Sequence, residues 1–246
     1  MTAVATQASS AIRTQIPARK ATSTQLPRLA PTAGADAGAA SLDRLGTLHV
    51  MPRGKTIVEQ GDSAEHVYKV VSGALRMVRL LPDGRRSVID FLLPGDFFGL
   101  AEDGTYSHSL EVLSDTSFVR YPKQQLKELL EEDPRAGRRF FNLMCGQLSA
   151  AQERLLTLCR KSAVERIASF LLAMTERTRS PKTVDANTIK LPMCRADIAD
   201  YLGLTIETVS RILTQLRESH VIDIPTASQI VVRDRNKLVT IGSGVA

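Results

Sequence analysis

The chain has 246 residues, of which 43% are hydrophobic and 24% charged, and its formal net charge is +6. This composition is ordinary for a soluble globular protein and excludes the disordered and fibrous classes, while the length suggests one or two domains. No apolar run approaches the roughly 18 residues that a membrane-spanning helix needs.

The charge is distributed unevenly along the chain. Lys and Arg exceed Asp and Glu by 3 in residues 1–40, by 4 in residues 137–164 and by 2 in residues 165–246. Residues 41–136 carry a net charge of −3. A basic C-terminal half suits a polyanionic partner such as nucleic acid.

Residues 1–40 are rich in Ala, Thr, Ser and Pro, and Asp36 is their only acidic residue. This composition predicts a flexible N-terminal extension. The acid-poor start also resembles an organellar transit peptide, but no sustained amphipathic helix accompanies it. The three cysteines, Cys145, Cys159 and Cys194, contain no C-x-x-C pair and follow no secretory signal, so we expect a reducing, cytoplasmic location.

From about Leu45 to Tyr121, short β-rich segments such as 74–81 and 87–93 alternate with turn signals. The turn signals are Arg53-Gly54, Gln60-Gly61, Ser72-Gly73, Asp83-Gly84, Pro94-Gly95-Asp96 and Asp103-Gly104. Short strands at regular spacing predict a small barrel or sandwich.

A short helix is predicted around Lys123 to Glu132, and a longer helix from about residue 135 to 160. In the longer helix, apolar or small residues recur at steps of three and four: Phe141, Cys145, Leu148, Ala151, Leu155 and Leu158. This heptad seam predicts a helix that pairs with its own copy, which would make the chain a homodimer. The alternative is a helix whose apolar face is buried within its own domain.

Helical sequence continues from Ser162 to about Glu176, and a short strand is predicted from Thr188 to Leu191. A helix at about Arg195 to Leu202, a break at Gly203 and a second helix over residues 204–217 form a helix-turn-helix pattern. Thr205 is placed to cap the second helix. Residues 220–224 and 229–233, joined by a turn at 225–228, predict a β-hairpin or wing.

The second helix is amphipathic. Its apolar residues Ile206, Val209, Leu213 and Leu216 share one face, and Glu207, Ser210, Arg211, Thr214 and Arg217 share the other. The polar face could be an ordinary solvated surface with an i,i+4 ion pair between Glu207 and Arg211. In a helix-turn-helix, however, the first residues of this helix enter the major groove of DNA.

In that arrangement four side chains of the second helix would lie next to the DNA bases. Arg211 can donate two hydrogen bonds to guanine and Glu207 can accept one from cytosine, so together they could read a G·C pair. Ser210 is a more adaptable contact, and Ile206 could touch a thymine methyl group.

The run MCRADIADYLGLTIETVSRILTQLRESHVI, residues 193–222, resembles the DNA-binding region of the Crp/Fnr superfamily of bacterial transcription regulators. Its E-x-x-S-R core is similar to that of the Fnr and FixK branch, and the resemblance extends over about residues 45–240, including the G-D-x-F-G segment at 95–99.

The resemblance implies an α+β fold. A flexible extension (1–40) would precede an N-terminal β-roll, a jelly roll like those that bind cyclic nucleotides (41–136), a long dimerisation helix (137–162) and a C-terminal winged helix-turn-helix (163–246). It implies a homodimeric activator that binds palindromes of TTGA and TCAA half-sites on double-stranded DNA and contacts RNA polymerase. Glu207, Ser210 and Arg211 would read bases, and Ile206, Thr205 and Arg195 complete the expected DNA-binding set.

The sequence departs from relatives that bind cyclic AMP. Those relatives follow a G-E-L segment with an Arg-Ser pair that holds the phosphate, and they carry Thr-Ser on the dimerisation helix. Here the corresponding residues are Gly99-Leu100, His108-Ser109 and Ala151-Gln152. A phosphate without its arginine loses a strong bidentate contact, so we expect no cyclic AMP binding. The N-terminal cysteines that hold the iron–sulfur centre of Fnr are absent as well, because no Cys precedes Cys145; we expect no cofactor.

Cys194 lies beside Arg195, directly before the first helix of the helix-turn-helix. Cationic charge and a helix N-terminus both favour a thiolate, which peroxide can oxidise. The hypothesis is that oxidation of Cys194 weakens DNA binding; the alternative is an inert small residue. For Cys145 and Cys159 we expect a packing role.

Two other functions stay open at this point. One is a regulator gated by haem or another small ligand in the roll, and the other is a cyclic-nucleotide-binding signalling module. The four histidines, His49, His66, His108 and His220, show no metal-ligand spacing. No nucleophile, base and orienting residue are grouped, so we do not expect an enzyme.

Overall fold

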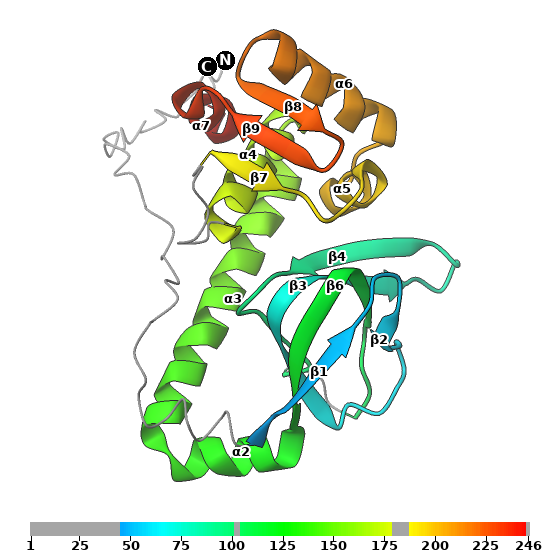
Figure 1. Cartoon of the computed structure of the whole chain (residues 1–246), viewed down its shortest axis with the longest axis vertical. Coiled ribbons are helices and arrows are strands. Elements are labelled where there is room, and N and C mark those ends of the chain that lie inside the picture. Colours follow the sequence, from blue (N-terminus) through cyan, green and yellow to red (C-terminus); the bar gives the residue numbers. More distant parts are fainter. Residues whose placement is uncertain (1–44, 101–103, 179–186, 245–246) are drawn as a thin grey trace, which may run out of the picture. The chain divides into compact units, whose positions relative to one another are not determined.

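A computed structural model of the chain describes residues 45–100, 104–178 and 187–244 (Figure 1). The predicted extension, residues 1–40, and Asp103 of the last predicted turn lie outside the described residues. Within these ranges, none of the helices combines the length and apolar character needed to cross a lipid bilayer.

Six antiparallel strands form the N-terminal roll. They are β1 (Thr47–Met51), β2 (Thr56–Val58), β3 (His66–Leu80), β4 (Arg86–Leu92), β5 (Phe97–Phe98) and β6 (Ser109–Pro122). The main order is β1-β6-β3-β4, with β2 paired to β6 and β5 paired to β3. The two long strands β3 and β6 pair from His66↔Pro122 to Val78↔Ser109, so they are the spine of the roll.

Aromatic side chains occupy the interior of the roll. Tyr68, Phe98, Tyr106 and Phe118 are each buried, with ring centroids 5.4–6.3 Å apart in four contacts. The Tyr106 hydroxyl donates a hydrogen bond to the carbonyl oxygen of His66 at 2.7 Å, which satisfies its polar group inside the apolar cluster.

The predicted turn at Ser72-Gly73 is wrong, because β3 continues through it with register shifts against β6 between Val70 and Ala74. Gly73 has φ +83°, and a Cβ built on it would lie 2.4 Å from the carbonyl oxygen of Asp115. The glycine therefore marks a β-bulge where two backbones approach closely, and not a chain reversal.

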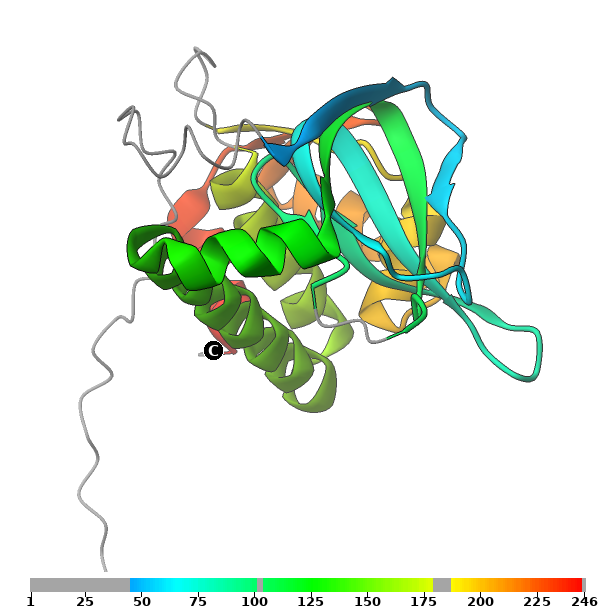
Figure 2. The ribbon, with the colours of Figure 1, turned by 90° about the horizontal axis from the view of Figure 1, so that it is seen from below.

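Helices α2 (Lys123–Glu132) and α3 (Pro134–Arg160) follow the roll, as the sequence predicts. Figure 2 shows α2 running from the end of β6 to the start of α3. The carboxylate of Asp133 caps α3 by accepting from the backbone N–H of Arg135 at 2.9 Å. Helix α4 (Ala163–Arg177) begins with a capping box formed by Ser162 and Glu165, which separates it from α3.

The C-terminal part contains β7 (Thr188–Lys190), α5 (Arg195–Leu202), α6 (Ile206–Glu218), β8 (Ile222–Thr226), β9 (Gln229–Val232) and α7 (Arg235–Ser243). The small sheet has the order β7-β9-β8 and provides the predicted wing. The predicted turn at 225–228 is too long, because β8 includes Pro225 and Thr226. Helix α7 was not predicted; it buries Leu238 and Gly242, and Gly242 accepts a hydrogen bond from Ser169 of α4.

Replacing Gly73 by Ala is expected to lower the free energy of unfolding by about 3 kcal/mol, because a positive φ and an overpacked contact each add a penalty. Gly84 is the matched control, since it has φ +82° but open space around its Cβ position. Gly84→Ala should cost only about 1–2 kcal/mol. Urea unfolding measures both values, and equal losses would contradict the close approach at Gly73.

Candidate nucleic-acid interface

A tight turn joins α5 to α6. Gly203 ends α5 in the left-handed conformation, with φ +63°, and the backbone N–H of Leu204 donates to the carbonyl oxygen of Ala199 at 2.8 Å. Thr205 then caps α6, as predicted, by accepting from the backbone N–H of Thr208 at 3.2 Å. These caps fix where one helix ends and the next begins.

The buried face of α6 differs from the predicted face at two residues. Val209, Ile212, Leu213 and Leu216 are buried, whereas Ile206 is 48% exposed. Ile206 is the first residue of the helix and lies at the edge of the core, whereas Ile212, which the sequence pattern did not include, is buried. The exposure of Ile206 leaves it accessible from outside the protein.

Glu207 and Arg211 are both exposed on the opposite face. Among the residues that the structure describes, no ion pair joins them, so the i,i+4 pair that was the alternative interpretation of this face is not formed. Hydrogen bonds from the backbone N–H of Glu207 and from the Thr205 side chain lower the pKa of Glu207, which keeps its carboxylate ionised. The helix therefore presents an anionic acceptor and a cationic donor to solvent, one turn apart.

Arg195 and Ser210 lie together between α5 and α6. The Arg195 guanidinium Nη1 donates to Ser210 Oγ at 3.3 Å, and both residues are half-buried. The predicted DNA-binding residues thus form one group: Thr205, Ile206, Glu207, Ser210 and Arg211 on or at the start of α6, with Arg195 reaching it from α5.

Cys194 is exposed and directly precedes α5. Its thiol and its backbone N–H both donate to Asp197 Oδ2 at 3.2 Å. The sulfur therefore faces a carboxylate, whereas the neighbouring guanidinium of Arg195 is directed to Ser210. Sequence reasoning missed Asp197, although a carboxylate three residues after a helix start is a signal for a capping interaction.

An apolar stripe follows α3. Phe141, Leu148 and Leu155 are 66%, 61% and 62% exposed. Cys145, Ala151 and Cys159 are exposed as well, and Leu158 is half-buried. Large exposed apolar side chains at heptad spacing are typical of a surface that packs against another helix. The packing roles expected for Cys145 and Cys159 are not found within the single chain.

The residues that replace a cyclic-nucleotide site make other contacts. Ser109 Oγ accepts from the backbone N–H of Gln60 at 2.9 Å, and Ala151-Gln152 lies exposed on α3. The His49 ring stacks on Phe118 at a centroid distance of 5.5 Å. Across residues 45–100, 104–178 and 187–244, His, Cys, Asp and Glu side chains form no group of three or more that could hold a metal ion.

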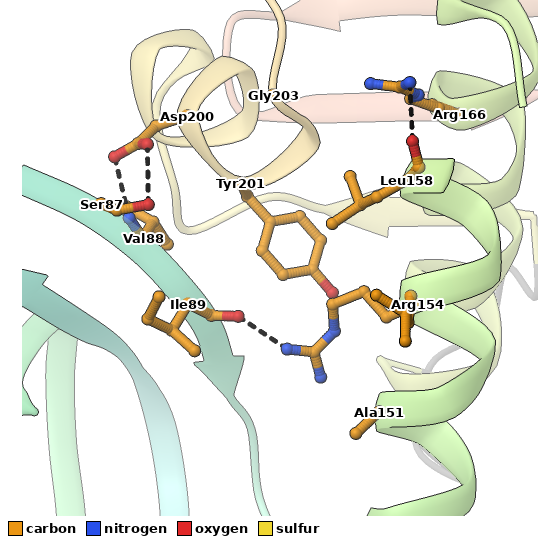
Figure 3. A pocket seen from close by; sticks show the side chains of 11 residues that line it. Ser87, Val88, Ile89, Ala151, Arg154, Leu158, Arg166, Asp200, Tyr201 and Gly203 are labelled. Atoms are coloured by element: carbon orange, nitrogen blue, oxygen red, sulfur yellow. Dashed lines mark hydrogen bonds between the residues drawn. The ribbon is translucent and has the colours of Figure 1, made fainter. Parts of the chain in front are cut away.

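A pocket of about 460 Å³ lies where β4, α3 and α5 meet (Figure 3). Its walls include residues 87–89 of β4, Tyr201 of α5 and Leu155 of α3. Two polar residues at this junction, Asp200 and Arg154, were not singled out from the sequence. Their partners on β4 include the backbone N–H of Val88 and the carbonyl oxygen of Ile89, which no local sequence signal identifies.

Comparison with known proteins shows two family matches in the chain. A model described as cyclic nucleotide-binding domain matches residues 48–133, and a model described as Crp-like helix-turn-helix domain matches residues 165–241.

Two curated relatives cover most of the chain. The nitrogen fixation regulation protein FixK of Azorhizobium caulinodans is 42% identical over 194 residues, which are 79% of this chain and 78% of that protein. The transcriptional activator protein FnrL of Cereibacter sphaeroides is 32% identical over 202 residues, or 81% and 82% of the two chains. The solved structure of FixK2 from Bradyrhizobium japonicum is 38% identical, has a TM-score of 0.74, and covers 82% of this chain and 99% of its own.

Proposed function

Because the chain belongs to the Crp/Fnr family of transcription regulators, with FixK proteins among its relatives, we propose that it is a DNA-binding transcription activator. The observation that carries this proposal is the exposed start of α6. A buried face anchors that helix, Thr205 caps it, and Glu207 and Arg211 extend into solvent without pairing to each other. An anionic and a cationic group held apart on a rigid helix match the edges of a base pair.

We propose that α6 enters the major groove and reads TTGA and TCAA half-sites. Arg211 donates to guanine and Glu207 accepts from cytosine of the same G·C pair, while Ile206 lies near a thymine methyl group. Ser210, held by Arg195, and the capping residue Thr205 lie at the start of this face. Basic side chains around them neutralise phosphates, which gives affinity without sequence preference.

The active unit in this proposal is a homodimer. Residues 137–162 pair with their copy through Phe141, Cys145, Leu148, Ala151, Leu155 and Leu158. A twofold dimer places its two recognition helices about one DNA turn apart, which matches a palindrome. Residues 163–246 then form the DNA-binding domain and residues 41–136 the roll. The dimer acts in the cytoplasm, where it contacts RNA polymerase, and it catalyses no reaction.

The proposed activator needs neither cyclic AMP nor an iron–sulfur cofactor. For cyclic AMP, support comes from the aromatic cluster around Tyr68 and Tyr106 inside the roll, where a small effector would have to displace packed side chains. For the iron–sulfur cofactor, support comes from the cysteines, since none precedes Cys145. The same aromatic cluster argues against a regulator gated by haem or another ligand in the roll, and against a cyclic-nucleotide-binding signalling module.

A gel-shift series with a TTGA/TCAA palindrome and no added effector tests the proposed function. Replacing Arg211 by Ala is expected to relax specificity at the G·C pair of each half-site. When that G·C pair is replaced, the binding free energy of the unchanged protein should weaken by about 1–3 kcal/mol. The variant should bind with the same affinity whichever of the four base pairs stands at that position. Arg217→Ala, near the end of the same helix, should keep the preference. If Arg211→Ala instead weakens binding to the palindrome and to random DNA by the same factor, Arg211 does not read a base directly.

Replacing Leu148 by Glu is expected to convert the dimer to monomer, because a charge in the apolar seam would be desolvated on pairing. Ser149→Glu adds the same charge one residue further along α3, outside the seam, and should leave the dimer intact. Sedimentation analysis distinguishes the two species. A Leu148→Glu protein that stays dimeric would place the interface elsewhere.

Peroxide treatment is expected to weaken DNA binding through Cys194. Hydrogen peroxide converts the thiol to a sulfenic acid and releases water, and the added bulk disturbs the hydrogen bonds to Asp197. Cys194→Ser should bind DNA equally before and after peroxide, as gel shifts under reducing and oxidising conditions would show. Cys159→Ser is the matched control and should remain sensitive. Loss of DNA binding by oxidised Cys194→Ser would rule out this redox role.

A further inference from the structure

Two carboxylates on α5 face the roll. Asp197 is only 4% exposed, and its Oδ1 accepts from Arg76 Nη1 of β3 at 2.6 Å. Three residues further along α5, Asp200 Oδ2 accepts from the backbone N–H of Val88 on β4 at 2.8 Å. Residues three apart lie on one side of a helix, so α5 is attached along that side to two neighbouring strands.

Arg76 is held between carboxylates of two different elements. Its Nε donates to Glu111 Oε2 of β6 at 2.6 Å, while Nη1 donates to Asp197. Burial disfavours the charged guanidinium, yet Glu111 and Asp197 together raise the pKa of Arg76. Arg76 and Glu111 are partly buried and Asp197 is buried, so removing Arg76 would leave the Asp197 carboxylate buried without its cationic partner.

Arg154 of α3 provides a second attachment. It donates to the carbonyl oxygen of Ile89 at 2.6 Å and to Asp90 Oδ2 at 2.7 Å, and its guanidinium lies 5.3 Å from the ring centroid of Tyr201 on α5. Figure 3 shows Asp200 and Arg154 on opposite sides of Tyr201. Because a pocket of about 460 Å³ adjoins them in place of packed side chains, these polar contacts determine much of the local geometry.

Arg177, the last residue of α4, provides a third attachment. It donates to the carbonyl oxygen of Phe91 at 2.8 Å and to Asp96 Oδ2 at 2.5 Å. Asp96 also accepts from the backbone N–H of Leu93 at 2.8 Å, so the turn after β4 is fixed by the same carboxylate. The roll is thus bonded to α3, α4 and α5 by separate arginine or aspartate side chains.

Fixing α5 also fixes α6. The two helices share a core that includes Ile198, Leu202 and Val209. They are further joined by the hydrogen bond from Leu204 to Ala199 across the turn and by the one from Arg195 to Ser210. The recognition face cannot tilt relative to α5 without breaking these contacts.

We propose that Asp200, together with Asp197, is a positioning residue for DNA reading, holding α5 on the roll so that α6 is presented at one angle without a bound effector. This inference rests on the proposed DNA-binding function and deepens it. Asp200 lies on α5, away from the polar face of α6, and acts through its contact with β4. Its loss leaves the Val88 N–H without that acceptor and lets α5 change its angle.

The test uses full-length protein and duplexes whose two half-sites are separated by spacers that lengthen in steps of one base pair. The unchanged protein is expected to bind one spacing best. Asp200→Ala should bind that spacing about tenfold more weakly and should distinguish neighbouring spacings less, because a hydrogen bond to a charged group is lost.

Two variants are controls. Asp200→Asn keeps an oxygen that can accept from Val88, so it should restore most of the affinity and the spacing preference. Asp83→Ala removes an exposed aspartate paired with Arg85 in the turn between β3 and β4, and it should change neither quantity.

Unchanged affinity and spacing preference in Asp200→Ala would overturn the proposal. An equal loss at every spacing would overturn it too, because it would indicate general loss of binding without a change of angle. If Asp200→Ala does not fold, Arg154→Lys replaces it: the charge stays, the forked contact to Ile89 and Asp90 is lost, and the same weaker spacing preference is expected.

Hydrogen exchange gives a readout that does not involve DNA, since the Val88 amide should exchange faster in Asp200→Ala than in Asp200→Asn. If the proposed DNA-binding function is wrong, the experiments give a different result. In that case the unchanged protein binds no duplex at any spacing, although the difference in Val88 exchange is still observed.

Discussion

A carboxylate buried in a protein needs a cationic or hydrogen-bonding partner, and Asp197 finds its partner in Arg76, 121 residues away in the sequence. The same side chain accepts from the backbone N–H of Cys194 at the start of α5. Asp197 therefore determines both where α5 begins and where it attaches to β3. Since α6 follows α5 through a tight turn, this ionic contact and the Asp200 contact beside it set the direction of α6 in the proposed activator.

The roll has a packed interior, and its outer surface contacts α5. Its interior holds Tyr68 and Tyr106 in a packed aromatic cluster, while Arg76 and the backbone of β4 offer the outer contacts to α5. The family model that matches residues 48–133 of this roll is described as cyclic nucleotide-binding domain. In the proposed activator the roll serves as the support against which the DNA-binding domain rests.

Elements with strong local signals were predictable from the sequence. Helix α5 begins at Arg195 and ends at Leu202 as predicted, because Gly203 stops it in the left-handed conformation. Asp83-Gly84 and Ser72-Gly73 carry similar signals, yet only the first forms a turn. The bulge at Gly73 depends on pairing with β6 some forty residues later, which a local pattern does not contain.

In the candidate site, too, the features set by local sequence were predictable and those set by distant contacts were not. The positions of Thr205, Glu207 and Arg211 follow from helix periodicity, so the polar face of α6 could be predicted although its base contacts stay predictions. The exposure of Ile206 depends on where the core ends. The roles of Asp200 and Arg177 depend on backbone groups of the roll that the three-dimensional fold brings to them. Short helix α7 was missed because Leu238 is the one large apolar side chain among its two buried residues, so its sequence has no clear apolar face.

Helix α3 makes contacts in two directions in the proposed dimer. Its apolar stripe, from Phe141 to Leu158, must face the second copy in the proposed dimer, and Arg154 on the same helix must face Ile89 and Asp90 of its own roll. Each residue added to an α-helix turns everything beyond it by about 100°. Insertions or deletions between Leu148 and Arg154 would therefore change the angle around the helix axis between the two contact faces. Only a change of about seven residues, close to two full turns, would preserve that angle. The length of this segment is constrained even where the identity of its exposed side chains is not.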